Sequence, residues 1–249
     1  MILAVDVGNS NTTVGLFNGT GELLFRALLE TSRSKTRDQC AIELLGVFQL
    51  YGADACTVDG AILSSVVPPL TTIVTDAIAR LTGIPPMVVG PGIRTGLNIK
   101  AEIHNQLGSD IVASSVAAIA KYPSPIVMVD MGTATSLSLI VGSVYEGCII
   151  MPGLALALDA LSERAAALPP ISIETASPVG LMCHTTEEAM RSGVLYGHAS
   201  MVDGMLERIE ESIGQSVTTV ATGGNAPRIL RYCKRPIQYD ADLIMTGLY

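Results

Sequence analysis

Short apolar runs and segments of helical periodicity alternate along the chain, which predicts a fold of mixed strands and helices. In the first half we expect strands at 2–6, 11–17, 22–28, 58–67 and 87–89, and helices at 36–51 and 68–81. In the second half we expect strands at 126–130, 134–141, 145–151 and 217–221, and helices at 154–167, 187–213 and 225–232. A helix over 109–122 joins the halves, so the predicted class is α/β.

The two halves begin with the same pattern. Residues 2–15 and 126–139 each form an apolar strand that ends in Asp-x-Gly, followed by small hydroxyl or amide residues and a second strand. A glycine in such a hairpin lets backbone N–H groups approach a phosphate closely. We therefore expect the hairpins around Gly8 and Gly132 to face each other across one nucleotide site.

Composition excludes several classes of protein. With 49% hydrophobic and 15% charged residues, the 249-residue chain can bury a large core and is not disordered. Mean hydropathy is +0.46, yet charge-free runs such as 60–75 carry Pro, Ser and Thr and are shorter than the ~20 apolar residues of a spanning helix. Five scattered cysteines and the lack of a signal-peptide pattern favour a cytoplasmic protein with reduced thiols and no membrane partner.

Charge argues against a nucleic-acid partner. The formal net charge is −8, no stretch forms a basic stripe, and the chain has no Trp. Phosphates would have to be bound by backbone N–H groups, helix N-termini and metal ions.

The first candidate site is the tip of the first hairpin. Asp6 ends a buried strand and can hold a hydrated Mg²⁺, while Gly8 allows a close approach to phosphate. Donors without positive charge follow at Asn9, Ser10, Asn11, Thr12 and Thr13. One such segment alone could be a plain β-turn, but the second copy favours a functional role.

The second hairpin and a later loop supply further candidates. Asp130 occupies the position of Asp6 and is a candidate cation ligand, with Thr133 a candidate phosphate donor. The glycines Gly223 and Gly224 form a tight strand–helix loop that could pack against a nucleoside, although many such turns use glycine. No GxGxxG or GxxxxGK pattern follows a strand, so Rossmann and Walker sites lose support.

Helix starts leave two interpretations open. Asp110 could be an N-cap or a general base for phosphoryl transfer, and the residues alone favour the cap. The segment 185–188 has the pattern of a helix cap.

On helix 187–213 an apolar stripe of Met190, Val194, Met201 and Met205 fits either the protomer's own core or a dimer interface.

Seven motifs, in order along nearly the whole chain, resemble the type III pantothenate kinases. They are Asp6-x-Gly-Asn-x-x-x-x-x-Gly15, Ser64-Ser-Val-Val-Pro-Pro-Leu70, Gly90-Pro-Gly-Ile-x-Thr-Gly-Leu-Asn-Ile99, Asp130-x-Gly-Thr-Ala-Thr135, Gly147-x-x-Ile-x-Pro-Gly153, Ala189-Met-x-Ser-Gly193 and Thr222-Gly-Gly224. The resemblance implies two domains of the actin-like ATPase (ribonuclease H-like) type around a cleft, 1–108 and 109–249. It also implies phosphorylation of pantothenate to 4'-phosphopantothenate by ATP, the first step to coenzyme A, with Mg²⁺, a monovalent cation (K⁺ or NH₄⁺) and a homodimer.

The resemblance also assigns residue roles. Asp110 would be the base, Asp130 would hold the monovalent cation, and Asp6 would hold Mg²⁺ through water. ATP would contact Asp6, Val7, Gly8, Asn9, Ser10, Asn11, Thr12, Thr13, Thr133, Gly223 and Gly224. Pantothenate would contact Gly108, Ser109, Asp110, Ile111 and Thr186.

The chain departs from the family pattern in the predicted substrate half. Ile111 stands where the family has Arg, 101–104 replaces a Tyr-(Asp or Glu)-Asn-Pro segment, and 183–186 replaces Gly-Lys-Asn-Thr. An aliphatic side chain cannot replace a guanidinium. Two alternatives therefore stay open: a nucleotide-binding, catalytically weak or inactive paralogue with a regulatory or partner-subunit role, and a kinase for another small hydroxyl substrate.

Overall fold

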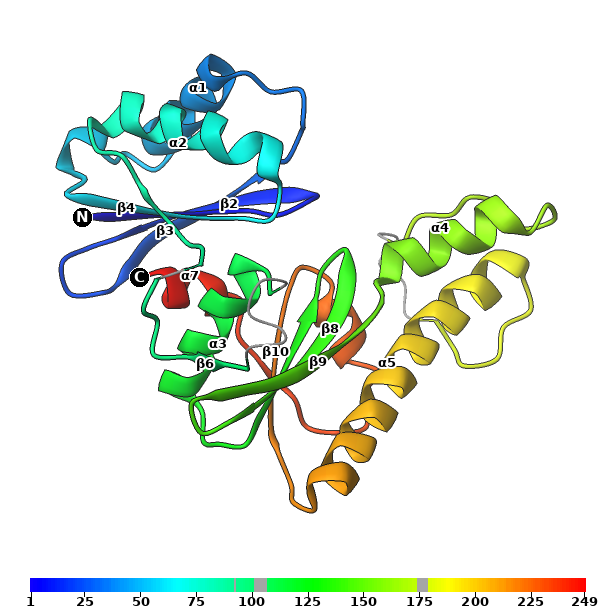
Figure 1. Ribbon diagram of the computed structural model, residues 1–249. Helices are drawn as coiled ribbons and strands as arrows, with labels where there is room; N and C mark the ends of the chain where they lie inside the picture. Colours follow the sequence, from blue (N-terminus) through cyan, green and yellow to red (C-terminus); the bar gives the residue numbers. More distant parts are fainter. Residues whose placement is uncertain (92, 101–106, 174–178) are drawn as a thin grey trace. The chain divides into compact units, whose positions relative to one another are not determined.

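The computed structural model describes residues 1–91, 93–100, 107–173 and 179–249. The chain forms two compact units, one of residues 1–120 with 242–249 and one of residues 121–241 (Figure 1). The C-terminal residues thus return to the first unit. The boundary that we predicted between residues 108 and 109 concerns the two repeated halves and stays a prediction.

A mixed sheet forms the centre of the first unit. Its order is β3-β2-β1-β4-β5, with β1 antiparallel to β2 and parallel to β4. The strands are β1 (Ile2–Val7), β2 (Asn11–Phe17), β3 (Leu23–Glu30), β4 (Gly60–Ser65) and β5 (Met87–Val88). The parallel pair places the ends of β1 and β4, at Val7 and Ser65, side by side.

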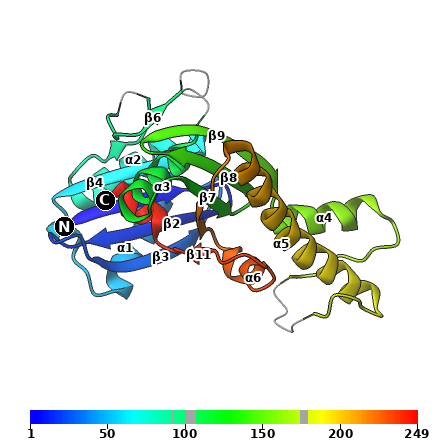
Figure 2. The same ribbon diagram turned by 90° about the horizontal axis from the view of Figure 1, so that it is seen from below.

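Helices cover both faces of this sheet (Figures 1 and 2). The remaining elements of the unit are α1 (Arg37–Leu50), η1 (Ala55–Thr57), α2 (Pro68–Thr82), β6 (Asn98–Ile99), α3 (Ser109–Lys121) and α7 (Leu243–Leu248). Helices α1 and α2 enclose the main core, whereas Ala113 of α3 and Met245 of α7 pack with Ala4 of β1 on the other face. A Cβ on Gly247 would collide with the carbonyl of Ala113, so α3 and α7 need a glycine there.

The second unit repeats the strand–hairpin start of the first. Its strands run in the order β11-β10-β7-β8-β9, with β7 antiparallel to β8 and parallel to β10. They are β7 (Ile126–Met131), β8 (Ala134–Val141), β9 (Val144–Pro152), β10 (Thr218–Thr222) and β11 (Gln238–Tyr239). The helices are α4 (Leu154–Arg164), α5 (Thr186–Ile213) and α6 (Ala226–Leu230).

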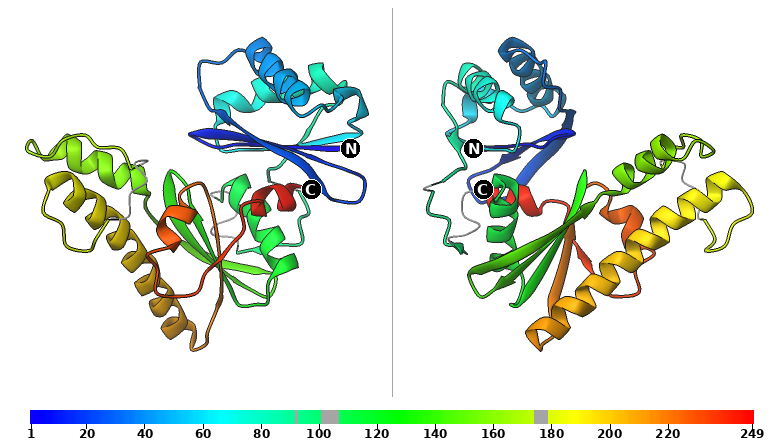
Figure 3. Two further views of the ribbon diagram at one scale, coloured as in Figure 1. Left: turned by 180° about the vertical axis from the view of Figure 1, so that it is seen from behind. Right: turned by 45° about the vertical axis from the view of Figure 1, so that its right-hand side comes forward.

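The long helix α5 packs along one face of this sheet, with α4 and α6 beside it (Figure 3). Of its predicted apolar stripe, Met190 and Val194 are buried in the unit's core, and Met201 and Met205 pack against that core. The stripe therefore fills the protomer's own core, the first of the two interpretations that the sequence left open.

The α/β class and the order of its main elements are as predicted, and the structure adds that both sheets are mixed. Several boundaries differ: β3 continues to Glu30, and α4 ends at Arg164 instead of 167. In the described part of the chain, no helix has both the length and the apolar character needed to span a bilayer. The predicted motif residue Gly92 and the departing segment 101–104 lie outside the described residues.

Candidate functional site

The first hairpin turns tightly after β1. Asp6 is 8% exposed at the end of the strand, and the N–H of Gly8 donates to the carbonyl of Asn11 at 3.0 Å. A Cβ on Gly8 would lie 3.0 Å from that same oxygen, so a side chain would press on the turn. The tip residues Asn9 and Ser10 are exposed to solvent, which lets the hairpin offer polar groups to a ligand.

Two of the predicted nucleotide-binding residues have structural contacts as well. The side chain of Val7 is buried in the core, and its carbonyl accepts from the N–H of Val66 at 3.0 Å. The hydroxyl of Thr12 lies 2.8 Å from that of Thr31, at the end of β3. The side chain of Val7 is therefore not available to a ligand, and Thr12 helps to hold the hairpin in place.

Asp110 lies in the same unit as the first hairpin, as the second residue of α3. The N-cap interpretation that the residues alone favoured is therefore wrong, because the helix already begins at Ser109. The Ser109 hydroxyl is 2.9 Å from that of Ser64 and accepts from the N–H of Ser65 at 3.0 Å. Ser64 is paired with Asp6 across the parallel strands. These contacts tie the helix that carries Asp110 to the strand ends that carry the hairpin.

The Asp110 carboxylate is held close to the backbone. Its Oδ1 accepts from the N–H of Ile111 at 2.8 Å, and a Cβ on Gly108 would collide with it. Burial raises the pKa of the Asp110 carboxyl, while the Ile111 N–H works in the opposite direction. A carboxylate with a raised pKa is a better proton acceptor than an ordinary aspartate, which is what a general base needs.

The second hairpin is enclosed by two glycines of its own unit. Gly223 has φ +93°, and a Cβ there would lie 2.6 Å from Oδ1 of Asp130. A Cβ on Gly153 would collide with the carbonyl of Thr133. The side chain of Asn225 donates to the carbonyl of Gly132 at 3.2 Å. Thr133 and Gly224 are exposed, so the predicted residues of this cluster are brought together around Asp130 with an open polar edge.

A buried histidine supports this hairpin, and sequence reasoning missed it. His198 of α5 is 5% exposed, and its Nε2 lies 2.9 Å from the hydroxyl of Thr135, which is fully buried. Burial lowers the pKa of His198, which favours the neutral ring. A histidine in the helical apolar pattern of α5 was the available signal, but the 63-residue separation concealed its partner.

Thr186 lies in the second unit, at the start of α5. The Thr185 hydroxyl accepts from the N–H of Glu188 at 3.3 Å and caps the helix, as the sequence predicted. Thr186 is exposed and lines an open hollow of about 790 Å³ together with residues 166–170, Thr185 and Glu187. A hydroxyl in that position can bond to a small polar ligand.

Carboxylates are the only anionic ligands that the predicted sites offer to metal ions. Within the described ranges, no three His, Cys, Asp or Glu side chains gather as a ligand set. Asp6 fits Mg²⁺ held through water, because this ion commonly keeps its waters and takes one or two carboxylates plus substrate phosphates. Asp130 also fits a cation, because its carboxylate oxygen lies beside main-chain carbonyl oxygens of its turn. Oxygen atoms of both kinds are suitable ligands for such an ion.

The chain matches the family model described as type III pantothenate kinase over residues 2–208. A type III pantothenate kinase of an Exiguobacterium species is 38% identical over 249 residues, covering 100% of this chain and 96% of the relative. One from Halalkalibacterium halodurans is 37% identical over 249 residues, covering 100% and 97%.

Solved structures show the fold. A putative Baf family transcriptional activator from Campylobacter jejuni superposes with a TM-score of 0.60 at 20% identity, covering 98% of this chain and 94% of that one. A ROK family glucokinase from Streptomyces griseus, in complex with glucose and AMPPNP, gives a TM-score of 0.57 at 12% identity, covering 99% and 97%. The fold is that of the actin-like ATPases, as predicted. With the family model and the full-length relatives, the chain belongs to the type III pantothenate kinase family.

Proposed function

We propose that this kinase transfers the γ-phosphoryl group of ATP to the hydroxyl of pantothenate, with Asp110 as the general base. The family gives the reaction, and the first unit supplies the observation that carries the assignment. Asp110 is a half-buried carboxylate with a raised pKa, and its helix is tied through Ser109 and Ser64 to the strand pair that ends in the first hairpin.

Proton transfer to Asp110 would accompany attack on phosphorus. The hydroxyl oxygen forms a bond to the γ-phosphorus, the bond to the ADP oxygen breaks, and the hydroxyl proton passes to the carboxylate. Phosphoryl transfer requires mainly positioning and charge stabilisation, so the residues around the carboxylate matter as much as its basicity. The Ile111 N–H orients Oδ1, and Gly108 leaves it room.

Both hairpins would serve the same nucleotide. The tip from Gly8 to Asn11 and the edge formed by Thr133, Gly223 and Gly224 are polar and accessible, as phosphate and nucleoside contacts require. Asp6 would hold Mg²⁺ through water and Asp130 would hold K⁺ or NH₄⁺. These cations would neutralise phosphate charge that a chain of net charge −8 cannot neutralise with basic side chains alone.

A homodimer would complete the substrate side. In the second unit Ile150, Leu156, Leu161, Leu181 and Met182 are exposed apolar side chains, from 39% to 86% exposed. Large exposed apolar side chains of this kind are available for an interface with a second copy of the chain. The open hollow at Thr186 would then bind pantothenate with a second copy of the chain nearby, in the cytoplasm.

One observation favours a second candidate function, that of a nucleotide-binding protein with little or no kinase activity. Ile111 places an aliphatic side chain beside the base where the family has Arg, so a nucleotide-binding paralogue of low activity is the alternative. Wild type and Asp110→Asn should be assayed for ADP release with pantothenate, and for binding of a non-hydrolysable ATP analogue. We expect turnover to fall by about 10²–10⁴-fold while analogue binding is kept. Equal turnover of the two proteins would remove Asp110 from the mechanism.

A further inference from the structure

A positively charged side chain lies at the tip of the first hairpin, although the sequence pattern there offers only neutral donors. Nη2 of Arg33 is 3.4 Å from Oδ1 of Asn9, and the arginine is exposed. Such a long contact is weak, and a guanidinium has five N–H donors. Most of the hydrogen-bonding capacity of Arg33 is thus available to a ligand.

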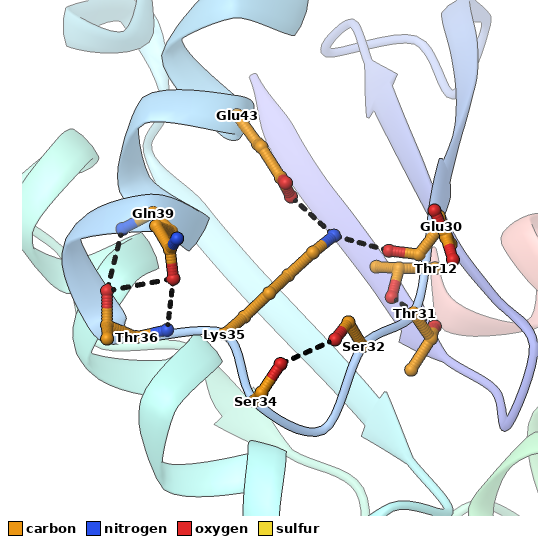
Figure 4. A network of polar contacts seen from close by, with 9 residues as sticks. All are labelled: Thr12, Glu30, Thr31, Ser32, Ser34, Lys35, Thr36, Gln39 and Glu43. Carbon is orange, nitrogen blue, oxygen red and sulfur yellow. Dashed lines mark hydrogen bonds and ion pairs between the residues drawn. The ribbon is translucent and has the colours of Figure 1, made fainter.

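The backbone around Arg33 is folded into a compact turn. The hydroxyls of Ser32 and Ser34, on either side of the arginine, are 2.9 Å apart, and the N–H of Lys35 donates to the carbonyl of Ser32 at 3.2 Å (Figure 4). The N–H of Thr31 donates to the carbonyl of Ser10 at 3.0 Å. Arg33 therefore stands at the apex of a turn whose first end is bonded directly to the hairpin tip.

Lys35 fixes the other end of the turn. Its side chain is 18% exposed, and Nζ contacts both the carbonyl of Glu30 and, at 2.9 Å, the carboxylate of Glu43 on α1 (Figure 4). Thr36 and Gln39 then form a capping box that begins α1. The ends of the segment 31–36 are thus tied to β3, α1 and the hairpin, which reduces the entropy that Arg33 would lose on binding.

Within the described residues, no carboxylate forms an ion pair with Arg33. Among the ion pairs of the described residues, Lys35 is paired with Glu43 and Arg37 with Asp38, but none includes Arg33. An arginine held without a carboxylate beside exposed polar residues is suited to phosphate, whose oxygens accept bidentate N–H bonds.

We propose that Arg33 is a phosphate-binding residue of this kinase, presented at the hairpin tip by the tethered segment 31–36, with Lys35 as the residue that positions it. The proposal rests on the proposed function, in which the first hairpin binds the phosphates of ATP. Arg33 bonds a phosphate oxygen in exchange for its long contact with Asn9.

Calorimetric titration of the full chain with a non-hydrolysable ATP analogue and with adenosine tests this. Arg33→Gln should weaken analogue binding about tenfold or more and leave adenosine binding unchanged, because only the analogue carries phosphates. The affinity of Arg33→Lys for the analogue should lie between those of wild type and Arg33→Gln, since lysine keeps the positive charge but lacks the planar fork of N–H donors. Arg37→Gln is the matched control, an exposed arginine four residues away that is paired with Asp38, and it should match wild type.

The outcomes distinguish a failure of the proposed function from a failure of the role proposed for Arg33. Failure of wild type to bind the analogue contradicts the proposed function itself. Wild-type binding with unchanged affinity in Arg33→Gln, or with equal losses for analogue and adenosine, overturns the role of Arg33 alone.

Lys35→Met tests the positioning role, because it keeps the aliphatic stem and removes the ammonium group. It should weaken analogue binding in the wild-type background and add little to Arg33→Gln, since it acts through Arg33. A full additional loss in the double variant would overturn that role. Circular dichroism and thermal melting of each variant identify any loss of folding.

Discussion

Replacing Gly223 by alanine should destabilise the second unit and displace Asp130. The residue has φ +93°, and an added Cβ would lie 2.6 Å from Asp130 Oδ1, 2.6 Å from the carbonyl carbon of Met131 and 2.7 Å from its oxygen. Real Cβ atoms are not found under 3.0 Å from such neighbours, so the strand end has to move by several tenths of an ångström. Two of the three neighbours are backbone atoms, which cannot yield as a flexible side chain does.

The cost follows from two terms. A left-handed conformation costs an L-residue about 1–2 kcal/mol. Overpacking against neighbours that cannot move freely costs about 1–3 kcal/mol. Gly223→Ala should therefore lower the free energy of unfolding by about 2–5 kcal/mol. The Cβ of Gly224→Ala would meet no heavy atom within 4 Å, so this neighbouring variant should stay within about 0.5 kcal/mol of wild type.

Urea unfolding measures the stability of each variant, and amide hydrogen exchange measures the protection of β7 and β10. Activity assays with and without K⁺ or NH₄⁺ measure the effect on the cation site. Gly223→Ala should lose protection in these two strands, and its activity should no longer respond to K⁺ or NH₄⁺ because the Asp130 carboxylate is displaced. Gly224→Ala should match wild type in stability and strand protection, and its activity, whatever the rate, should still depend on K⁺ or NH₄⁺. Equal stability and equal cation response in the two variants would refute the account of this loop.

Three other predictions concern protonation and packing. Because burial raises the pKa of Asp110 and the base must be ionised, kcat/KM should fall with decreasing pH through a pKa above the ordinary value of 3.8; an acid limb at or below that value would contradict it. Burial lowers the pKa of His198 below 6.5, so the unfolded chain binds more protons and stability should fall as the pH decreases from about 6.5. Urea midpoints across this range should lose part of that dependence in His198→Gln but not in His184→Gln, which changes an exposed histidine, and equal slopes would count against the buried neutral ring. Gly247→Ala should lower the melting temperature by several degrees because its Cβ meets the carbonyl of Ala113, and an unchanged melting curve would show that α7 moves away without cost.

Local sequence signals predicted the hairpins and the cap of α5, but not the start of α3, where Asp110 lies inside the helix. The two Asp-x-Gly segments end buried strands as expected, at β1 and β7, because apolar runs followed by glycine and small polar residues favour a strand and a tight turn. Thr185 caps α5 because its hydroxyl can reach a free N–H of the first turn.

Long-range packing could not be read from the same signals. The contact of Thr135 with His198 joins residues 63 positions apart, and α7 returns to the first unit because Gly247 can approach Ala113. Arg33 reaches the hairpin tip only through the turn of the segment 31–36, which has no motif of its own. Pairings of this kind depend on tertiary structure rather than on local periodicity.

The most direct test of the central claim is the identity of the product. Purified chain should be incubated with ATP, Mg²⁺ and K⁺, and with either pantothenate or a panel of other small alcohols, and the products analysed by mass spectrometry. The account predicts ADP and a pantothenate product heavier by one phosphoryl group, formed by wild type and strongly reduced in Asp110→Asn. ATP binding without any phosphorylated pantothenate, or preferential phosphorylation of another alcohol, would contradict it.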